Sequence, residues 1–153
     1  MLTLPQTAEY AIRAVCCIAE REAGGPVPVS AIAAQLGAPQ NYLSKTLHQL
    51  GVLGVLQSVR GAQGGYRLGM RPEELRLAAI IEPFLPPVEH RCIMGHGHCG
   101  DEHACGAHWR WKAVKETTRA FFEDITIADL LVQSDHPLRP QLVPPKAAAG
   151  GGR

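Results

Sequence analysis

Long apolar runs are missing from the 153-residue sequence, because charged residues or prolines interrupt every apolar stretch. A membrane-spanning helix needs about 18 or more consecutive apolar residues, so a bilayer span is excluded. The opening stretch MLTLPQTAEYAIR also lacks the basic leader and the unbroken apolar core of a secretory signal. We therefore expect a cytoplasmic protein.

Aromatic residues are scarce as well, at 5% of the chain, which predicts an aliphatic core. The five cysteines are an odd number, and a reducing compartment disfavours disulfides. The cysteines are therefore interpreted as metal ligands, reactive thiols or small core residues. Cys16 and Cys17 fall within the first expected helix, which favours the last of these roles.

Acidic residues are absent from the fifty residues 23–72, although this segment holds four cations. These are Lys45, Arg60, Arg67 and Arg71. The rest of the chain holds eleven cations and fourteen acids, so the net charge of +1 hides a basic segment. A surface of one sign is expected where a protein binds the nucleic-acid backbone. Four cations in fifty residues also suit an ordinary solvated face, so charge alone does not decide.

Two helices and a turn are predicted before residue 40. Apolar residues recur at helical spacing over 8–19, and this first helix ends before Gly24. A shorter apolar stripe over 32–36 stops at Gly37, which predicts a second helix of two to three turns.

The third expected helix has two contrasting faces. Its leucine face repeats at i, i+4 and i+7, and its polar face contains no acid. Such a helix can lie in the major groove of DNA, with its polar face toward the base edges. Any compact helical protein also has polar outer faces, so the pattern is suggestive rather than decisive. The candidate DNA-binding residues on this helix are Asn41, Tyr42, Ser44, Lys45 and His48.

A β-hairpin is predicted directly after this helix. Residues 55–59 and 66–68 read as two short strands, and the glycines of the loop 60–65 allow a tight connection. Helix, turn, helix and hairpin follow one another as in a winged helix-turn-helix, so we expect a mainly α fold. Arg60 and Gly61 at the hairpin tip are further candidate DNA-binding residues, and Arg60 is placed to contact the minor groove or a phosphate.

The second half of the chain predicts a dimer. After a short fourth helix at about 77–82, a long helix carries an apolar stripe from Trp109 to Ile125. That stripe is too wide for one monomer of this size to cover, and a short helical piece follows at 126–132. The expected organisation is a winged helix-turn-helix domain at 1–88, a Cys/His loop at 89–108, a dimerisation helix at 109–133 and a disordered, proline-rich tail at 134–153.

The segment between His90 and His108 concentrates three cysteines and five histidines. No two of its cysteines are separated by only two to four residues, which disfavours a structural zinc site. Iron-sulfur clusters are held by thiolates, tolerate wider spacing and accept histidine in place of cysteine. We therefore favour a cluster over zinc or simple thiol oxidation. The cysteines are Cys92, Cys99 and Cys105, and His108 follows the last of them by three residues, whereas the histidines at 90, 96, 98 and 103 fit solvated loop positions.

The sequence resembles the Rrf2 (Rrf-two) family of bacterial winged helix-turn-helix transcription regulators. The resemblance covers about 1–131 and is carried by TAEYAIRA, IAAQLGAPQNYLSKTLHQL, GVLQSVRGAQGGYRLG and ITIADLL. It implies a homodimer that binds double-stranded DNA, with one winged helix in each subunit and a long dimerisation helix that crosses its partner.

The resemblance also implies a cofactor. Three cysteines in this region of the family ligate an iron-sulfur cluster, and Cys92, Cys99 and Cys105 match them. One branch adds a histidine three residues after the last cysteine, which matches His108 and goes with a 2Fe-2S cluster. Another branch uses a carboxylate on the first helix of the other subunit, which matches Glu9 and goes with a 4Fe-4S cluster. The two ligand schemes stay open.

The expected function is a transcription regulator, acting as a repressor, whose operator affinity depends on a cluster that senses redox state, nitric oxide or iron. An enzyme is the main rival from another class. A catalytic metal site needs an open coordination position beside a substrate pocket with a positioned acid or base. Only Asp101 and Glu102 lie near the candidate ligands, so an enzyme is disfavoured.

Overall fold

The computed structural model describes residues 4–85, 92, 94–95 and 99–132. The expected tail at 134–153 and the histidines at 90, 96 and 98 lie outside these residues. The helices and strands are α1 (Gln6–Arg21), α2 (Val29–Leu36), α3 (Gln40–Val52), β1 (Leu56–Val59), β2 (Gly65–Leu68), α4 (Leu77–Ile81), α5 (His108–Asp124) and α6 (Ile127–Val132), with short 3-10 turns at Glu22–Gly24, Glu82–Phe84 and Asp101–His103.

The mainly helical fold with a two-stranded wing is confirmed. The ends of the short elements differ slightly from the prediction. β1 starts at Leu56 instead of residue 55, and β2 starts at Gly65 instead of residue 66. The fourth helix continues past Ile81 as a 3-10 turn, because Pro83 lacks the amide hydrogen that an α-helix would use there.

Helix α1 is the centre of the winged domain. It packs against α2, α3, α4, α6 and β2, so most of its circumference is covered. The buried residues that the structure describes include no Phe, Tyr or Trp, which confirms an aliphatic core. Cys16 and Cys17 are 1% and 2% exposed, and burial raises the pKa of Cys16 to about 12. These two cysteines are core residues, as expected.

The turn between α2 and α3 depends on one glycine. Gly37 has a φ of 61°, in the left-handed region where a Cβ is disfavoured, and it ends α2. Pro39 then precedes α3, and its carbonyl accepts the amide of Leu43 at 3.0 Å. Leu43, Leu47 and Leu50 are fully buried, so the leucine face fixes α3 against α1 while the other face stays in solvent.

The wing is an antiparallel hairpin extended by a third short segment. Tyr66 exchanges both backbone hydrogen bonds with Val27, each at 2.9 Å. A Cβ at Gly65 would lie 2.3 Å from the Val27 carbonyl oxygen, and one at Gly64 would lie 2.4 Å from the Val59 carbonyl oxygen. The two glycines are therefore required for these close approaches, which explains the GGY sequence physically.

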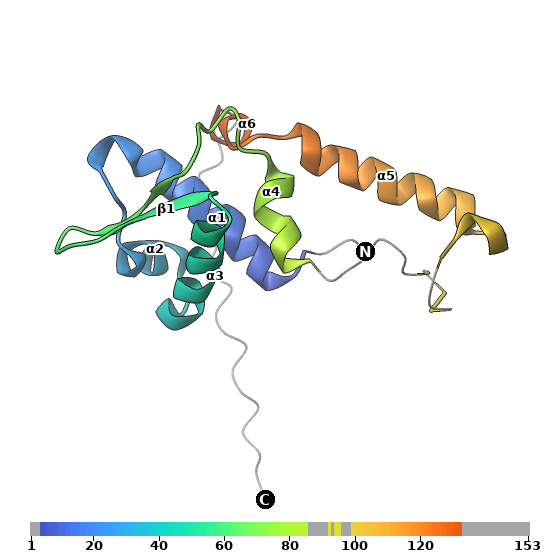
Figure 1. Cartoon of the computed structure of the whole chain (residues 1–153), viewed down its shortest axis with the longest axis horizontal. Helices are drawn as coiled ribbons and strands as arrows, with labels where there is room; N and C mark the ends of the chain where they lie inside the picture. Colours follow the sequence, from blue (N-terminus) through green and yellow to red (C-terminus); the bar gives the residue numbers. More distant parts are fainter. Residues whose placement is uncertain (1–3, 86–91, 93, 96–98, 133–153) are drawn as a thin grey trace, which may run out of the picture.

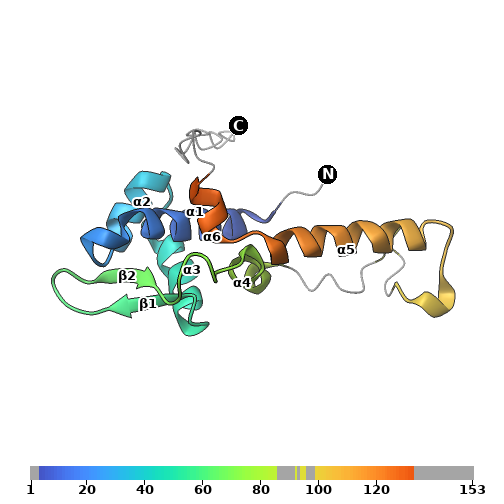
Figure 2. The same cartoon turned by 90° about the horizontal axis from the view of Figure 1, so that it is seen from above.

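Helix α5 extends away from the winged domain, whereas α6 turns back and packs on α1 (Figures 1 and 2). The helix is interrupted at Ile125, whose backbone is extended, so the region 109–133 holds two helices. The segment before α4 holds this junction, because the amide of Leu77 donates to Ile125 and the amide of Ile127 donates to Leu75, each at 2.9 Å. Within the described residues, no helix has the length and apolar character needed to span a membrane.

Candidate DNA-binding surface and metal centre

The solvent face of α3 carries the polar residues expected to contact DNA. Asn41, Lys45 and His48 are exposed. The segment 23–72, which includes α3, contains no acidic residue. Ser44 is half-buried, and its hydroxyl donates to the Gln40 carbonyl at 2.8 Å. Its oxygen therefore remains an acceptor, whereas the other three side chains can also donate to phosphates or base edges.

Tyr42 makes contacts with α1 that the sequence did not predict. Its hydroxyl is hydrogen-bonded to the hydroxyl of Thr7, and its ring meets the edge of Tyr10 at 5.8 Å between centroids. Both partners lie on α1, so Tyr42 fixes the start of α3 to α1 while 38% of it remains exposed. A contact with DNA at Tyr42 stays a prediction.

The tip of the wing presents a cation on a tight turn. Arg60 is exposed, and the following Gly61 has a φ of 118° that disfavours any residue with a Cβ. The amide of Gly64 closes the turn by donating to the Gly61 carbonyl at 3.0 Å. Arg67 is also exposed on the same hairpin, opposite Gln57, so the wing carries two cations.

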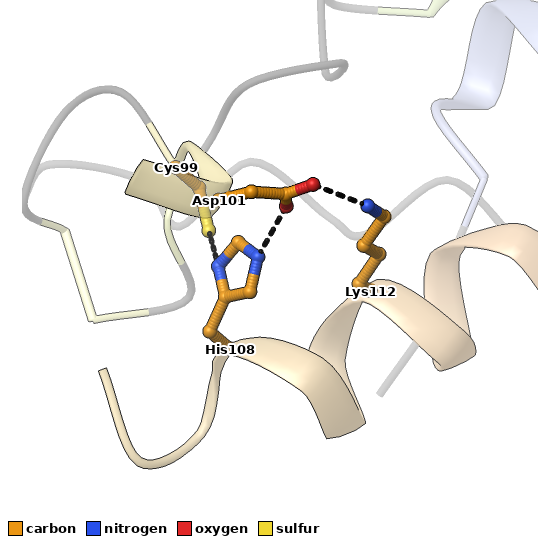
Figure 3. A network of polar contacts seen from close by, with 4 residues as sticks. All are labelled: Cys99, Asp101, His108 and Lys112. Carbon is orange, nitrogen blue, oxygen red and sulfur yellow. Dashed lines mark hydrogen bonds and ion pairs between the residues drawn. The ribbon is translucent and has the colours of Figure 1, made fainter. Parts of the chain in front are cut away.

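Two of the four predicted metal ligands come together at the start of α5. The Sγ atom of Cys99 lies 3.2 Å from Nδ1 of His108 (Figure 3). His108 is the first residue of α5 and is only 4% exposed, which is unusual on a helix whose other residues are not buried. Trp109 is packed edge-on against the imidazole, with 4.9 Å between ring centroids.

A carboxylate holds the other side of this imidazole. Oδ1 of Asp101 lies 2.8 Å from Nε2 of His108, and Oδ2 lies 2.8 Å from Nζ of Lys112. The hydrogen bonds from Lys112 and then His108 hold the pKa of Asp101 below its ordinary value, and the bond to Asp101 raises the pKa of Lys112. From the sequence, Asp101 was expected only as a nearby acid, and no role was expected for Lys112. The lysine four residues after His108 was the available signal, because that spacing places both on one helix face.

The other candidate ligands differ in their exposure. Cys105 is exposed, and its backbone carbonyl accepts the amide of His108 at 2.9 Å. Cys92 is half-buried, and Glu9 is exposed on α1. Among the described residues, no three histidine, cysteine or acidic side chains converge as a bound metal requires. The full ligand set therefore stays a prediction, whereas the pairing of Cys99 with His108 is a structural fact.

The chemistry of this pair fits an iron-sulfur cluster. A thiol sulfur and an imidazole nitrogen are both ligands that such clusters accept. They face each other in a half-buried position, and the opposite imidazole nitrogen is hydrogen-bonded to a carboxylate, as is usual for histidines that bind metals. The fit extends to these two side chains.

Three large apolar side chains of α5 are exposed in the single chain. Trp109, Val114 and Phe121 are 61%, 43% and 54% exposed. Phe122, on the adjoining face, is half-buried against the core of the winged domain. The predicted apolar stripe from Trp109 to Ile125 therefore packs partly against the core, whereas most of its residues face solvent.

Comparisons with known proteins agree with this arrangement. Residues 4–133 match the family model Rrf2, described as an iron-dependent transcriptional regulator. The HTH-type transcriptional regulator IscR of Aliivibrio salmonicida is 28% identical over 134 residues, which are 88% of this chain and 80% of that protein. A solved structure titled T. potens IscR is 27% identical, covers 86% of this chain and 87% of its own, and superposes with a TM-score of 0.69.

The fold is shared with more distant relatives. The structure of CymR, the global cysteine regulator of B. subtilis, is 22% identical and superposes with a TM-score of 0.75 over 86% of this chain and 98% of its own. These relatives are regulators rather than enzymes. The family match, the winged fold and the acid-free α3 surface together establish that this chain belongs to the Rrf2 family and is a DNA-binding transcription regulator.

Proposed function

We propose that the protein is a homodimeric repressor whose operator affinity is set by an iron-sulfur cluster held in the loop before α5. The observation that carries the proposal is the 3.2 Å approach of Cys99 to a buried His108 at the first turn of the long helix. Buried histidines need partners, and this one has a thiol on one side and a carboxylate on the other. The names of the relatives support the same function, since the family description is iron-dependent.

Each part of the chain has a separate task in this proposal. Helix α3 and the wing contact DNA in the cytoplasm, and Cys92, Cys99 and Cys105 hold the cluster by their sulfurs. His108 is the fourth ligand, which implies a 2Fe-2S cluster. When bound, a cluster held by these residues would supply iron sensitive to nitric oxide, to oxidants and to iron supply. Since His108 begins α5, its ligation fixes the start of that helix relative to the loop.

The exposed apolar face of α5 is assigned to the dimer. Trp109, Val114 and Phe121 lie on a helix that projects beyond its own domain, where a second copy can cover them (Figure 1). Apolar patches of this kind on regulators are typical of subunit interfaces. The dimer places two copies of α3 at a fixed separation, which two half-sites on DNA require.

The first test is anaerobic purification with quantification of iron and sulfide and an absorption spectrum. We expect a brown protein with equimolar iron and sulfide. A colourless protein that contains zinc, or no metal, would refute the cluster. Cys99→Ala should remove the cluster, and Cys17→Ala is the matched control, because Cys17 is a buried residue of α1 whose thiol donates to Gln35 of α2.

The second test distinguishes the two ligand schemes. His108→Ala and Glu9→Gln are each reconstituted with iron and sulfide and compared with the wild type by absorption and electron paramagnetic resonance. We expect only His108→Ala to change the spectra. A change in Glu9→Gln alone would assign the fourth ligand to the first helix of the other subunit. Operator binding with and without the cluster then measures the coupling, which we expect to be about 5- to 150-fold.

A further inference from the structure

The contact network around His108 contains more than candidate ligands. Asp101 belongs to the short 3-10 turn Asp101–His103, between Cys99 and Cys105 in sequence, and its carboxylate bridges two side chains of the first turns of α5 (Figure 3). Asp101 is itself exposed, so burial does not require it to have these partners. The two 2.8 Å contacts instead select one orientation of the carboxylate.

The contact with Asp101 determines where the proton of the neutral imidazole sits. A carboxylate can only accept hydrogen bonds, so Nε2 of His108 must carry the hydrogen in the 2.8 Å contact. In a neutral imidazole the other nitrogen then bears the lone pair. That nitrogen is Nδ1, and it is the atom 3.2 Å from the sulfur of Cys99.

Lys112 and Trp109 restrict the movement of the same group. Lys112 occupies the second carboxylate oxygen of Asp101, and its Nζ also lies 5.4 Å from the centre of the Trp109 ring. Trp109 in turn contacts the His108 ring. The imidazole therefore contacts the carboxylate and the indole, and the ammonium contacts both of these groups.

From this geometry we infer that Asp101 is a positioning residue for metal coordination. It holds His108 in the tautomer and orientation that present the Nδ1 lone pair beside the Cys99 sulfur, and Lys112 steadies Asp101 in this position. The inference rests on the proposed function, in which His108 is a cluster ligand. It adds a specific coordinating atom, Nδ1, and an outer residue on which the ligation depends.

The first measurement uses the cluster-free protein labelled with ¹⁵N histidine, at a pH well above the ordinary histidine pKa of about 6.5. We expect the two-bond ¹H–¹⁵N spectrum to show His108 with its hydrogen on Nε2 in the wild type. Asp101→Asn retains an acceptor oxygen and should keep this tautomer, whereas Asp101→Ala should give a mixture. Finding the hydrogen on Nδ1 in the wild type, or an unchanged tautomer in Asp101→Ala, would overturn the inference.

The second measurement uses the reconstituted holoprotein and follows the rate at which a chelator removes the iron. Removing an outer partner of a metal-binding histidine typically weakens binding about 10- to 100-fold, so Asp101→Ala should lose iron at least about ten times faster. Asp101→Asn should lie between Asp101→Ala and the wild type. Glu102→Ala is the matched control, because it removes the neighbouring exposed acid of the same turn and should behave as the wild type.

The two measurements separate this inference from the proposed function. A wild type that takes up no cluster refutes the proposed function, and with it the role in coordination, while the tautomer still shows whether Asp101 orients His108. A wild type with a cluster and an Asp101→Ala variant of equal iron-release rate refutes the positioning role alone. Pulsed electron paramagnetic resonance on ¹⁵N-labelled protein provides a signature that simple loosening of the loop would not give, namely a changed coupling between the cluster and the His108 nitrogen in Asp101→Ala.

Discussion

The winged domain and the arm formed by α5 differ in how much of their surface they bury within one chain. Seven of the sixteen residues of α1 are buried, whereas α5 buries only His108 among its seventeen. Helix α1 is surrounded by other elements, but α5 projects from them (Figure 2). The winged domain thus buries its core within a single chain, whereas the arm leaves most of its surface exposed. Substitutions in the winged domain should therefore lower its stability, whereas substitutions in the arm should affect dimerisation.

The largest effect is expected for Phe121→Asp on the arm. Phe121 is 54% exposed in the single chain, so the monomer tolerates an aspartate, but burying a carboxylate in an apolar dimer interface costs several kcal/mol. We expect a folded monomer in analytical ultracentrifugation, with helical content unchanged by circular dichroism. Val52→Asp, at an exposed apolar position on the winged domain, should remain dimeric. A dimeric Phe121→Asp variant would contradict the prediction that α5 forms the dimer interface.

The next effect tests the completeness of the winged domain. Leu47 is fully buried between α3 and α1, so Leu47→Ala should lower the free energy of unfolding by about 2–5 kcal/mol in urea denaturation. Val114→Ala, on the exposed face of α5, should have a much smaller effect when measured in the monomeric Phe121→Asp background. Equal losses in the two regions would contradict the comparison.

A smaller effect is expected within the winged domain, on binding rather than folding. Arg60→Ala should weaken binding to a specific operator by about 1–3 kcal/mol if the wing reads a base edge. Lys45→Ala should instead reduce the salt dependence of binding, because a phosphate contact releases counterions. Arg119→Ala is the matched loss of one charge on α5, where Arg119 pairs with Glu123 at 2.8 Å. Its operator affinity and salt dependence should equal those of the wild type.

The smallest effect concerns the point where the arm rejoins the domain. Asp129 accepts hydrogen bonds from the amide and hydroxyl of Thr126, which lower its pKa, and Thr126 Oγ1 accepts the amide of Asp129 in return. A lowered folded pKa means that the stabilisation is present above the unfolded value, about 3.9, and is lost as pH falls through the folded value. Asp129→Asn should be slightly less stable at neutral pH, and the difference from the wild type should shrink in acid.

The winged domain was accessible from the sequence because its signals are local. The leucine repeat of α3 and the glycines of the wing each act within a few residues, and the structure confirmed the elements to within one residue at the strands. The positive φ of Gly61 and the crowding at Gly65 show why such positions are informative. Only glycine satisfies them, so its presence predicts the turn.

The contacts between residues far apart in the sequence were less accessible, because the spacing of such residues has no period. The bridge from Asp101 to His108 and Lys112 depends on the path of the loop back to α5, and the bond between Thr7 and Tyr42 depends on how α1 crosses α3. The ligand pair Cys99 and His108 followed from residue chemistry and the family resemblance. The complete ligand set and the dimer stay predictions, because the cluster and the second subunit are not part of the single chain.

The junction at Arg76 has a mechanical consequence for the arm. Arg76 pairs with Thr126 in a β-bridge, and its guanidinium donates to the carbonyl of Glu123, so the last turn of α5 is fastened to the segment that leads into α4. From there to His108, seventeen residues at 1.5 Å each make a rod of about 25 Å. A pivot of about 10° at the fastening displaces the far end of such a rod by about 4 Å. A small rotation near α4 would therefore move the His108 end of α5, beside Cys99, by more than the length of a hydrogen bond. Conversely, a small displacement at the His108 end would cause only a slight rotation near α4.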